Sequence, residues 1–401
     1  MILVLAKKNL KEIANDLFIL FFLYSNRSMK IFLSKPHMGG KEQDFVKDAF
    51  DSNFIAPLGP HLDSFEESVS TYLGKNLYCV GLSSGTAALH LALLVAGVKK
   101  DDEVWVSSMT FGGGVFPINY IGAKPRFFDL NKDTWCIDVD ILSEELRVAS
   151  KQNRLPKAII PTDLYGQSVD LDRLESLAEE YEIKLIIDSA ESLGAEYLNG
   201  RKAGTGGDIS ILSFNGNKII TTSGGGMIVT KNKAWAEKAK FLSTQARDKA
   251  IHYEHSTIGY NYRLSNICAA IGLGQMSVLD DRVQKRREIF SYYANKLSGD
   301  GITFMPEPNG YKSSRWLTTL SIDENITNKS SNEIIELLDK HQIESRPLWK
   351  PMHMQPVYKE IPYHGIGFDE SLFNSGICLP SCSDMTSQEQ NEIIDLISEA
   401  I

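Results

Sequence analysis

The chain has 401 residues, of which 43% are hydrophobic and 23% charged, and its formal net charge is -9 at pH 7. This composition is ordinary for a globular protein and supplies enough apolar material for a large domain and a smaller one. Lys and Arg form no basic stripe, so the sequence argues against nucleic acid as a partner.

The first 28 residues contain a short apolar run, LFILFFLY from Leu17 to Tyr24. The run is too short to span a bilayer, and no small-residue cleavage pattern follows it, which disfavours both a membrane anchor and a signal peptide. Met29 begins a segment typical of a domain start, so we expect residues 1–28 to be an extension outside the fold. The five cysteines have scattered spacings, which predicts free thiols, a cytoplasmic protein and no bound metal.

From about Leu77 onward, short apolar segments alternate with helical ones, such as the apolar stretch from Ala87 to Ala96. Strands are expected over Leu77–Leu82, Glu103–Val106, Lys124–Asp129, Ala158–Pro161, Lys184–Ile187, Ile209–Phe214 and Met227–Thr230. Strands separated by helices predict an α/β fold with a mostly parallel sheet covered on both faces, which forms a large domain over residues 29–300. In such sheets, ligands bind beyond the carboxyl ends of the strands.

Turn signals between Asp300 and Gly310 mark the end of this domain. Beyond them, Arg315 to Ile322 alternates in polarity as a strand does. Two capping boxes precede apolar helices: Ser330 with Glu333, and Thr386 with Glu389. These elements predict a small C-terminal α/β domain over residues 301–401, joined by the N-terminal segment near residues 30–65.

The first chemical signal is Ser83-Ser84-Gly85-Thr86, between a strand and a helix. The unpaired amides and the dipole of a helix start favour an anion, and Gly85 lets that anion approach the backbone. Thr86 adds a hydroxyl donor. Ser and Thr are also ordinary helix caps, so this turn by itself indicates either a phosphate site or a cap.

Asp188 and Lys218 are the second and third signals. Asp188 ends a strand, where a carboxylate can pair with a pyridinium nitrogen or merely cap a turn. Lys218 follows a strand and precedes a glycine-rich stretch. Schiff-base chemistry requires a neutral amine, which a desolvated lysine provides, although most loop lysines lie on the surface. Neither residue is decisive alone, but their order after the phosphate turn predicts a pyridoxal phosphate site, with Ser213 as a further phosphate donor.

These motifs resemble the sugar-nucleotide aminotransferases of the DegT/DnrJ/EryC1/StrS family. Among these, the sequence is most similar to the enzymes that aminate C4 of UDP-2-acetamido-2,6-dideoxy-hexos-4-ulose on the bacillosamine pathway. The resemblance runs from about residue 30 to the C-terminus and rests on PHMGG (from Pro36), IAPLG (Ile55), TAALH (Thr86), LYG (Leu164), DSAE (Asp188), SFNGNKIITTSGGGM (Ser213), GYNYRLSN (Gly259), SRPLWKPMH (Ser345) and CLPS (Cys378). It implies the aspartate-aminotransferase-like fold of type I pyridoxal phosphate enzymes.

The resemblance also assigns roles. The residue that matches Lys218 holds the cofactor as a Schiff base and moves protons, Asp188 matches the partner of the pyridine nitrogen, and Glu191 matches a residue near the phenolic oxygen. The other expected cofactor contacts are Ser84, Gly85, Thr86 and Ser213 at the phosphate, Phe111 stacked on the ring, and Asn261 reaching the phosphate of the neighbouring subunit.

The candidates for substrate contacts are Arg263, Trp349, Lys350 and His353. Arg263 and Lys350 could bind the anionic parts of glutamate or UDP, and the alternative for Arg263 is a surface charge at a helix start. Trp349 and His353 could line the sugar-nucleotide pocket or pack between the domains.

The sequence departs from the family pattern at three places. Asp163 stands where many relatives have His before Leu-Tyr-Gly, and Ser189 and Ser192 stand where alanines are common. Gly112-Gly113-Gly114 follows Phe111, where bulkier residues are usual. The glycines predict a larger or looser wall beside the cofactor ring.

The expected activity is a two-step transamination, with glutamate as the amino donor and a UDP-linked 4-keto sugar as the acceptor, in a homodimer with a shared active site. One alternative is a C3 or C4 aminotransferase that acts on a dTDP-linked keto-deoxysugar. A second is a dehydratase, which Lys218 opposes because relatives with that activity carry histidine there. A third, of another class, is a non-catalytic binding protein on the same fold.

Overall fold

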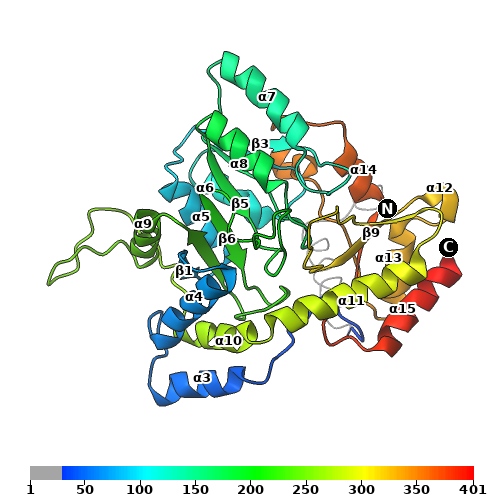
Figure 1. The fold of residues 1–401 in the computed structure, drawn as a ribbon, viewed down its shortest axis with the longest axis horizontal. Helices are drawn as coiled ribbons and strands as arrows, with labels where there is room; N and C mark the ends of the chain where they lie inside the picture. Colours follow the sequence, from blue (N-terminus) through cyan, green and yellow to red (C-terminus); the bar gives the residue numbers. More distant parts are fainter. Residues whose placement is uncertain (1–28) are drawn as a thin grey trace, which may run out of the picture.

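The computed structural model describes residues 29–401, and the extension expected over residues 1–28 lies outside them. The described chain forms two sheets of unequal size (Figure 1). The larger sheet has the strand order β1 (Tyr78–Leu82), β7 (Gly226–Thr230), β6 (Ile209–Ser213), β5 (Lys184–Asp188), β4 (Ala158–Ile160), β2 (Glu103–Ser107), β3 (Lys124–Phe128) and β11 (Tyr363–His364). Only β7 runs antiparallel to its neighbours in this sheet, which confirms the predicted mostly parallel arrangement.

The large sheet is buried on both faces. In β5, Leu185 and Ile187 belong to one core and Ile186 to the other, because successive side chains of a strand point to opposite faces. Burial on both sides explains why these strands read as continuous apolar runs. Helices α5 (Gly85–Val95), α6 (Phe116–Tyr120) and α9 (Lys233–Ser243) contribute to the core of Ile186, and α4 (Pro60–Leu73), α7 (Val139–Lys151) and α8 (Leu171–Glu180) to the opposite one.

The smaller sheet has the order β10 (Arg346–Pro347), β12 (Gly376–Leu379), β9 (Thr318–Ile322) and β8 (Ile302–Phe304), antiparallel throughout. It shares a separate core with α11 (Leu279–Leu297), α13 (Ser331–Lys340) and α15 (Ser387–Ala400). Both predicted capping boxes form, at the starts of α13 and α15. Ile31 pairs with Ile343, so the segment that begins at Met29 lies beside this smaller unit.

The C-terminal region differs from the sequence-based expectation in two respects. The strand expected from Arg315 begins only at Thr318, because Arg315 has a φ of 49°, a left-handed conformation that cannot continue a strand. In addition, β11 leaves the smaller unit and pairs with β3 at the edge of the large sheet. The domain division at residue 301 therefore remains a prediction.

The remaining elements are α3 (Glu42–Asp51), α10 (Asn266–Met276), α12 (Glu324–Thr327), α14 (Phe368–Ser375) and the short turns η1 (Gly112–Gly114), η2 (Met352–Met354) and η3 (Pro356–Tyr358). All five cysteines carry free thiols, as the spacings predicted. Within residues 29–401, no helix combines the length and the apolarity needed to cross a membrane.

Candidate active site

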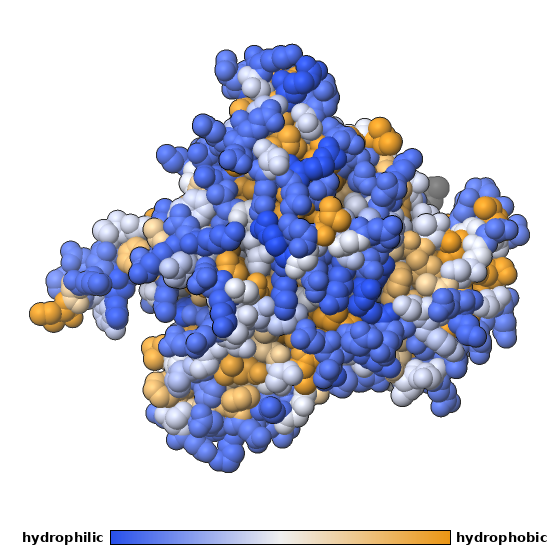
Figure 2. All heavy atoms as spheres, in the orientation of Figure 1, coloured by the Kyte–Doolittle hydropathy of each residue, from blue (hydrophilic) through white to orange (hydrophobic). Residues whose placement is uncertain are grey.

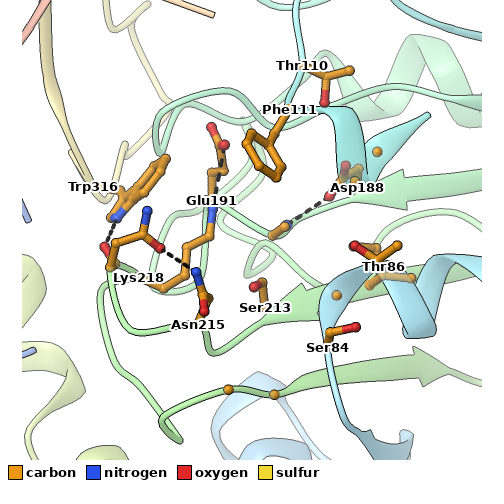
Figure 3. A pocket seen from close by; sticks show the side chains of 18 of the residues that line it. Ser84, Thr86, Thr110, Phe111, Asp188, Glu191, Ser213, Asn215, Lys218 and Trp316 are labelled. Atoms are coloured by element: carbon orange, nitrogen blue, oxygen red, sulfur yellow. Dashed lines mark hydrogen bonds and ion pairs between the residues drawn. The ribbon is translucent and has the colours of Figure 1, made fainter. Parts of the chain in front are cut away.

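A cavity of about 330 Å³ lies at the carboxyl ends of β5 and β6, beside the start of α5. Its size suits a small organic ligand, and its position is the one expected for ligands in parallel sheets. The cavity brings together nine of the predicted residues: Ser84, Gly85, Thr86, Phe111, Asp188, Glu191, Ser213, Lys218 and Trp349 (Figure 3).

The start of α5 forms one wall of the cavity. Ser84 is the N-cap, and its Oγ accepts a hydrogen bond from the backbone N of Ala87 at 3.0 Å. The capping role is compatible with anion binding, because Gly85 and Thr86 both line the cavity. A Cβ atom added to Gly85 would lie 3.2 Å from Cβ of Ser213, so glycine lets these two walls approach. The helix dipole favours an anionic group here, such as a phosphate.

Asp188 is the last residue of β5, and its side chain points into the cavity (Figure 3). Its Oδ1 accepts a hydrogen bond from the backbone N of Ala190 at 3.1 Å. Burial raises the pKa of Asp188 to about 7, the charge of Glu191 acts in the same direction, and the charge of Lys218 opposes both. A cationic ring nitrogen placed against this carboxylate would offset the cost of burying its charge.

Lys218 reaches the cavity from the loop after β6. Its Nζ lies 3.6 Å from Oε1 of Glu191 and 3.9 Å from the centroid of the Trp316 ring. Burial lowers the pKa of Lys218, and the charges of Glu191 and Asp188 oppose that change. Desolvation therefore favours the neutral amine, which is the form that attacks a carbonyl carbon.

Glu191 and Trp349 also line the cavity. Glu191 accepts hydrogen bonds from the backbone N of Tyr165 at 2.9 Å and from the indole Nε1 of Trp349 at 3.1 Å. The Phe111 ring lies edge-on to Trp349, with 5.9 Å between centroids, and is 64% exposed. Its exposed surface at the cavity can stack on a planar ligand.

The structure gives a different account of the glycine run after Phe111. A Cβ atom on Gly113 would lie 2.7 Å from Oγ1 of Thr86, and a Cβ atom on Gly114 would lie 2.7 Å from Oδ2 of Asp188. Both distances are too short for real contacts. The expectation of a looser wall is therefore wrong, because these glycines let the η1 turn close tightly over the cavity.

Arg263 does not reach the cavity. Its side chain is buried, forms an ion pair with Glu66 and donates a hydrogen bond to the carbonyl oxygen of Gly81 at 2.9 Å. The guanidinium is thus neither a surface charge at a helix start nor free to bind a substrate carboxylate in this chain. The sequence motif could not reveal the buried acidic partner of Arg263.

Asn261, Lys350 and His353 also lie outside the set of residues that line the described cavity. His353 stacks on Tyr363 with 3.9 Å between ring centroids, and its Nε2 lies 3.1 Å from Oε1 of Glu370. These contacts favour the packing alternative for His353. Asn261 is exposed to solvent.

Trp316 is a cavity residue that sequence reasoning missed. It lies between the left-handed Arg315 and the start of β9, and no local pattern marks it. Its Nε1 donates a hydrogen bond to the carbonyl oxygen of Asn217 at 2.7 Å, next to Lys218 in the chain. Over residues 29–401, no group of three or more His, Cys, Asp or Glu side chains is placed to hold a metal ion.

Comparison with known proteins identifies the relatives of this chain. The model of the DegT/DnrJ/EryC1/StrS aminotransferase family matches residues 36–398. A protein of Bacillus subtilis called EpsN, provisionally assigned as a pyridoxal phosphate-dependent aminotransferase, is 48% identical over 92% of this chain and 95% of its own length. The GDP-perosamine synthase of Vibrio cholerae is 33% identical over 90% of this chain and 97% of its own.

Two further matches concern other sugar aminotransferases. The UDP-4-amino-4,6-dideoxy-N-acetyl-beta-L-altrosamine transaminase of Campylobacter jejuni is 38% identical over 59% of this chain and 61% of its own. The solved structure of Helicobacter pylori PseC, an aminotransferase involved in the biosynthesis of pseudoaminic acid, superposes with a TM-score of 0.85 at 25% identity, over 92% of this chain and 98% of that one. The expected fold is therefore confirmed.

Proposed function

This chain belongs to the DegT/DnrJ/EryC1/StrS aminotransferase family of pyridoxal phosphate-dependent enzymes, and we propose that it transfers the amino group of glutamate to C4 of a UDP-linked 2-acetamido-2,6-dideoxy-4-keto-hexose. The observation that carries the proposal is the convergence of Lys218, Asp188 and the start of α5 in one cavity. The product would be a UDP-4-amino sugar of the bacillosamine type, used in surface glycan synthesis.

The cavity residues fit the cofactor. Ser84, Gly85, Thr86 and Ser213 would hold its phosphate at the start of α5, and Phe111 would stack on its ring. Asp188 would face the ring nitrogen, because a buried carboxylate without a basic hydrogen-bond partner is stabilised by a cation. Glu191 stays fixed beside Lys218 through its two nitrogen donors.

The chain's own residues supply the proton transfers. The bound cofactor provides an electron sink that stabilises negative charge at the reacting carbon. Lys218 Nζ, which burial favours in the neutral form, accepts the proton from Cα of glutamate and later delivers a proton to C4 of the sugar. Glu191 Oε1, 3.6 Å from that nitrogen, stabilises it while it carries the extra proton.

A second nucleotide is a candidate for the carrier of the keto sugar. The UDP-linked substrate is supported by the bacillosamine-type motifs of the sequence and by the name of the Campylobacter jejuni relative. A GDP-linked keto sugar is favoured by the Vibrio cholerae relative, whose name is that of a GDP-perosamine synthase and whose match covers more of this chain. Both candidates use the same chemistry at C4.

A homodimer with a shared active site is part of the proposal. An arm (residues 247–258) projects from the body beyond α9 in Figure 1, and Figure 2 shows apolar atoms at its tip. Ile251, Tyr253 and Ile258 in this arm are each at least 80% exposed, which is typical of a surface that another chain covers. Thr244 pairs with Asn261 at the base of the arm. A residue that contacts the partner's cofactor must be exposed in the single chain and lie outside its own cavity. Asn261 meets both conditions.

The test is an amino-transfer assay with purified protein and nitrogen-15-labelled glutamate. UDP-, GDP- and dTDP-linked 4-keto-6-deoxy sugars are offered separately, and NMR locates the label in the product. We expect label at C4 of the UDP-linked sugar. Label at C4 of the GDP-linked sugar alone would establish the second candidate. Label at C3, or no transfer to any of the three, would contradict the proposal.

A further inference from the structure

Asp163 is the acceptor at the centre of a buried hydrogen-bond cluster next to the cavity. Its Oδ2 accepts hydrogen bonds from the hydroxyls of Ser189 at 2.7 Å, Ser192 at 2.8 Å and Tyr197 at 3.1 Å, and its Oδ1 accepts one from the backbone N of Val169 at 2.9 Å. Two of the departures from the family pattern, the aspartate at 163 and the serines at 189 and 192, are thus in direct contact.

This cluster holds the turn that carries two cavity carboxylates. The backbone N of Asp163 donates to the carbonyl oxygen of Asp188 at 3.0 Å. Ser189 directly follows Asp188 in the chain, and Ser192 directly follows Glu191. Asp163 therefore holds both ends of the turn, so a change in its side chain reaches Asp188 and Glu191 together.

The cluster also places a second negative charge near Asp188. Asp163 is fully buried, and none of the basic side chains in the described part of the chain forms an ion pair with it. Burial raises the pKa of Asp163 to about 6, and its hydrogen bonds from Val169, Ser189, Ser192 and Tyr197 lower it. Four hydrogen-bond donors and no acceptor partner surround the carboxyl oxygens, an arrangement that favours the ionised form, and its charge helps to raise the pKa of Asp188.

The titratable groups that face Asp163 come from several segments. They are Asp188 and Tyr197, and the charge of Asp163 also raises the pKa values of Cys136 and Tyr311. Glu191 and Lys218 act on the pKa of Asp188 in opposite directions. None of the groups that donate a hydrogen bond to Asp163 carries a positive charge. Hydroxyl donors stabilise a buried carboxylate without neutralising it, whereas an arginine or a lysine would cancel its field.

We propose that Asp163 is a positioning residue that fixes Asp188 and Glu191 through the two serines, and that its buried negative charge strengthens the hold of Asp188 on the cationic ring nitrogen of the cofactor. This inference rests on the proposed function, because it requires Asp188 to face that nitrogen. A negative charge near a base raises the affinity of that base for a proton. Asp163 thereby helps to keep the ring in its electron-withdrawing form.

The test compares two variants of the holoenzyme. Asp163→Asn removes the charge and retains the shape, and the surrounding hydroxyls can rotate to accept as well as donate, so the protein should fold. Ser192→Ala removes one donor and retains the carboxyl group. In Asp163→Asn, we expect the pH midpoint of the visible absorbance of the bound cofactor to move to lower pH by at least roughly half a pH unit. We also expect kcat to fall roughly tenfold, with a smaller change in KM for glutamate.

The control separates charge from packing. Ser192→Ala should move the pH midpoint less than Asp163→Asn does, because it removes one of four donors and leaves the carboxyl group in place. An unmoved midpoint in Asp163→Asn, or an equal displacement in both variants, would overturn the inference. If the wild-type protein binds no cofactor with visible absorbance, the proposed function fails and the inference fails with it. If the wild-type cofactor absorbance titrates with pH and Asp163→Asn has the same midpoint, the inference is rejected while the proposed function stands.

A second readout needs no cofactor. Because the pKa of Asp163 is raised in the folded protein, the native state keeps a proton between about pH 4 and pH 6 that the unfolded chain has released. The free energy of unfolding of the cofactor-free protein must then fall as pH rises through that window. Urea denaturation across this range should give a shallower fall for Asp163→Asn than for the wild type, and an equal fall would show that the buried charge is absent.

Discussion

Lys218 and Trp316 are joined in two ways: the lysine Nζ lies 3.9 Å from the centroid of the indole ring, and the indole Nε1 donates to the carbonyl oxygen of Asn217, the residue before the lysine. The indole therefore fixes the lysine at its backbone and at its amine. Arg286 supports this arrangement, since it donates to the carbonyl oxygen of Trp316 and to Oγ of Ser34. Ser34 in turn donates to the same Asn217 carbonyl at 2.6 Å.

Replacing Trp316 by Phe should separate these two contacts. The phenyl ring keeps an aromatic face over the amine and loses the hydrogen bond to Asn217, so the lysine loop gains freedom. We expect kcat to fall roughly tenfold while the cofactor still binds, because a small misplacement of the reacting amine is costly. Trp235→Phe is the matched control, since Trp235 also lies under a lysine but outside the cavity. Equal losses in both variants would contradict this role of Trp316.

Removing the Lys218 amine should abolish turnover. Lys218→Ala removes the amine that we propose to hold the cofactor covalently and to move protons, so both the visible absorbance of the holoenzyme and the transfer of amino groups should disappear. Steady-state kinetics and an absorbance spectrum measure these losses. Lys202→Ala is the control, because Lys202 also lies over an aromatic ring, that of Tyr72, and does not line the cavity. A normal spectrum in Lys218→Ala would refute the assignment.

The sequence predicted the features that local patterns encode. The strands that lead to Asp188 and Ser213 and the two capping boxes follow from residues close together in the chain, although β6 ends at Ser213, one residue before the expected end at Phe214. Apolar runs mark strands buried on both faces, and turn residues mark their ends. The order of these signals along the chain was enough to locate the cavity, because parallel strands align their carboxyl ends.

Features that depend on tertiary contacts escaped prediction. Trp316 reaches the cavity from another unit of the fold, and Arg263 is withdrawn from it by Glu66, a residue distant in sequence. In the sequence, the glycines after Phe111 indicated a cavity wall without large side chains, whereas in the structure they let the backbone of η1 approach Asp188 closely. In each case, the side chain that decides the outcome lies far away along the chain, where no periodicity or motif spacing can report it.

Gly114→Ala tests the tight closure of η1. The added methyl group would lie 2.7 Å from Oδ2 of Asp188 and 2.7 Å from Oγ1 of Thr110, so the turn or the carboxylate must move. We expect affinity for the cofactor to fall roughly tenfold or more, because overpacking of a well-packed wall typically costs about 1–3 kcal/mol. Equilibrium dialysis of the cofactor measures this change. Gly299→Ala, which meets nothing within 4 Å, should bind as the wild type does. Unchanged affinity in Gly114→Ala would mean that η1 is not rigid.

Mixing two inactive variants tests the shared active site. Lys218→Ala lacks its own amine, and Asn261→Ala lacks the residue that we assign to the partner's cavity. In a mixed dimer, one cavity combines an intact Lys218 with an intact Asn261 from the other chain. Random exchange of subunits should therefore restore about a quarter of wild-type activity, since half of the dimers are mixed and each has one complete cavity. If Asn261 serves its own cavity, or the protein is monomeric, mixing restores nothing.

Asp188→Asn should have opposite effects on function and on the stability of the cofactor-free protein. The pKa of Asp188 is raised to about 7 by burial, so between about pH 4 and pH 7 the folded state retains a proton that the unfolded chain has lost. The free energy of unfolding therefore falls as pH rises through this window, and above it the wild type bears the full cost of a buried charge. The variant has no such charge and should be more stable than the wild type above pH 7, by roughly 2 kcal/mol or more.

The same substitution should weaken cofactor binding and abolish turnover, because an amide cannot hold a cationic ring nitrogen. Urea denaturation at pH 5 and pH 8 gives the stability comparison, and absorbance gives the bound cofactor. A variant that is less stable than the wild type at pH 8 would mean that groups of the protein itself already stabilise the Asp188 carboxylate. A gain in stability together with a loss of cofactor would instead identify Asp188 as a residue whose unfavourable burial is maintained for the ligand it binds.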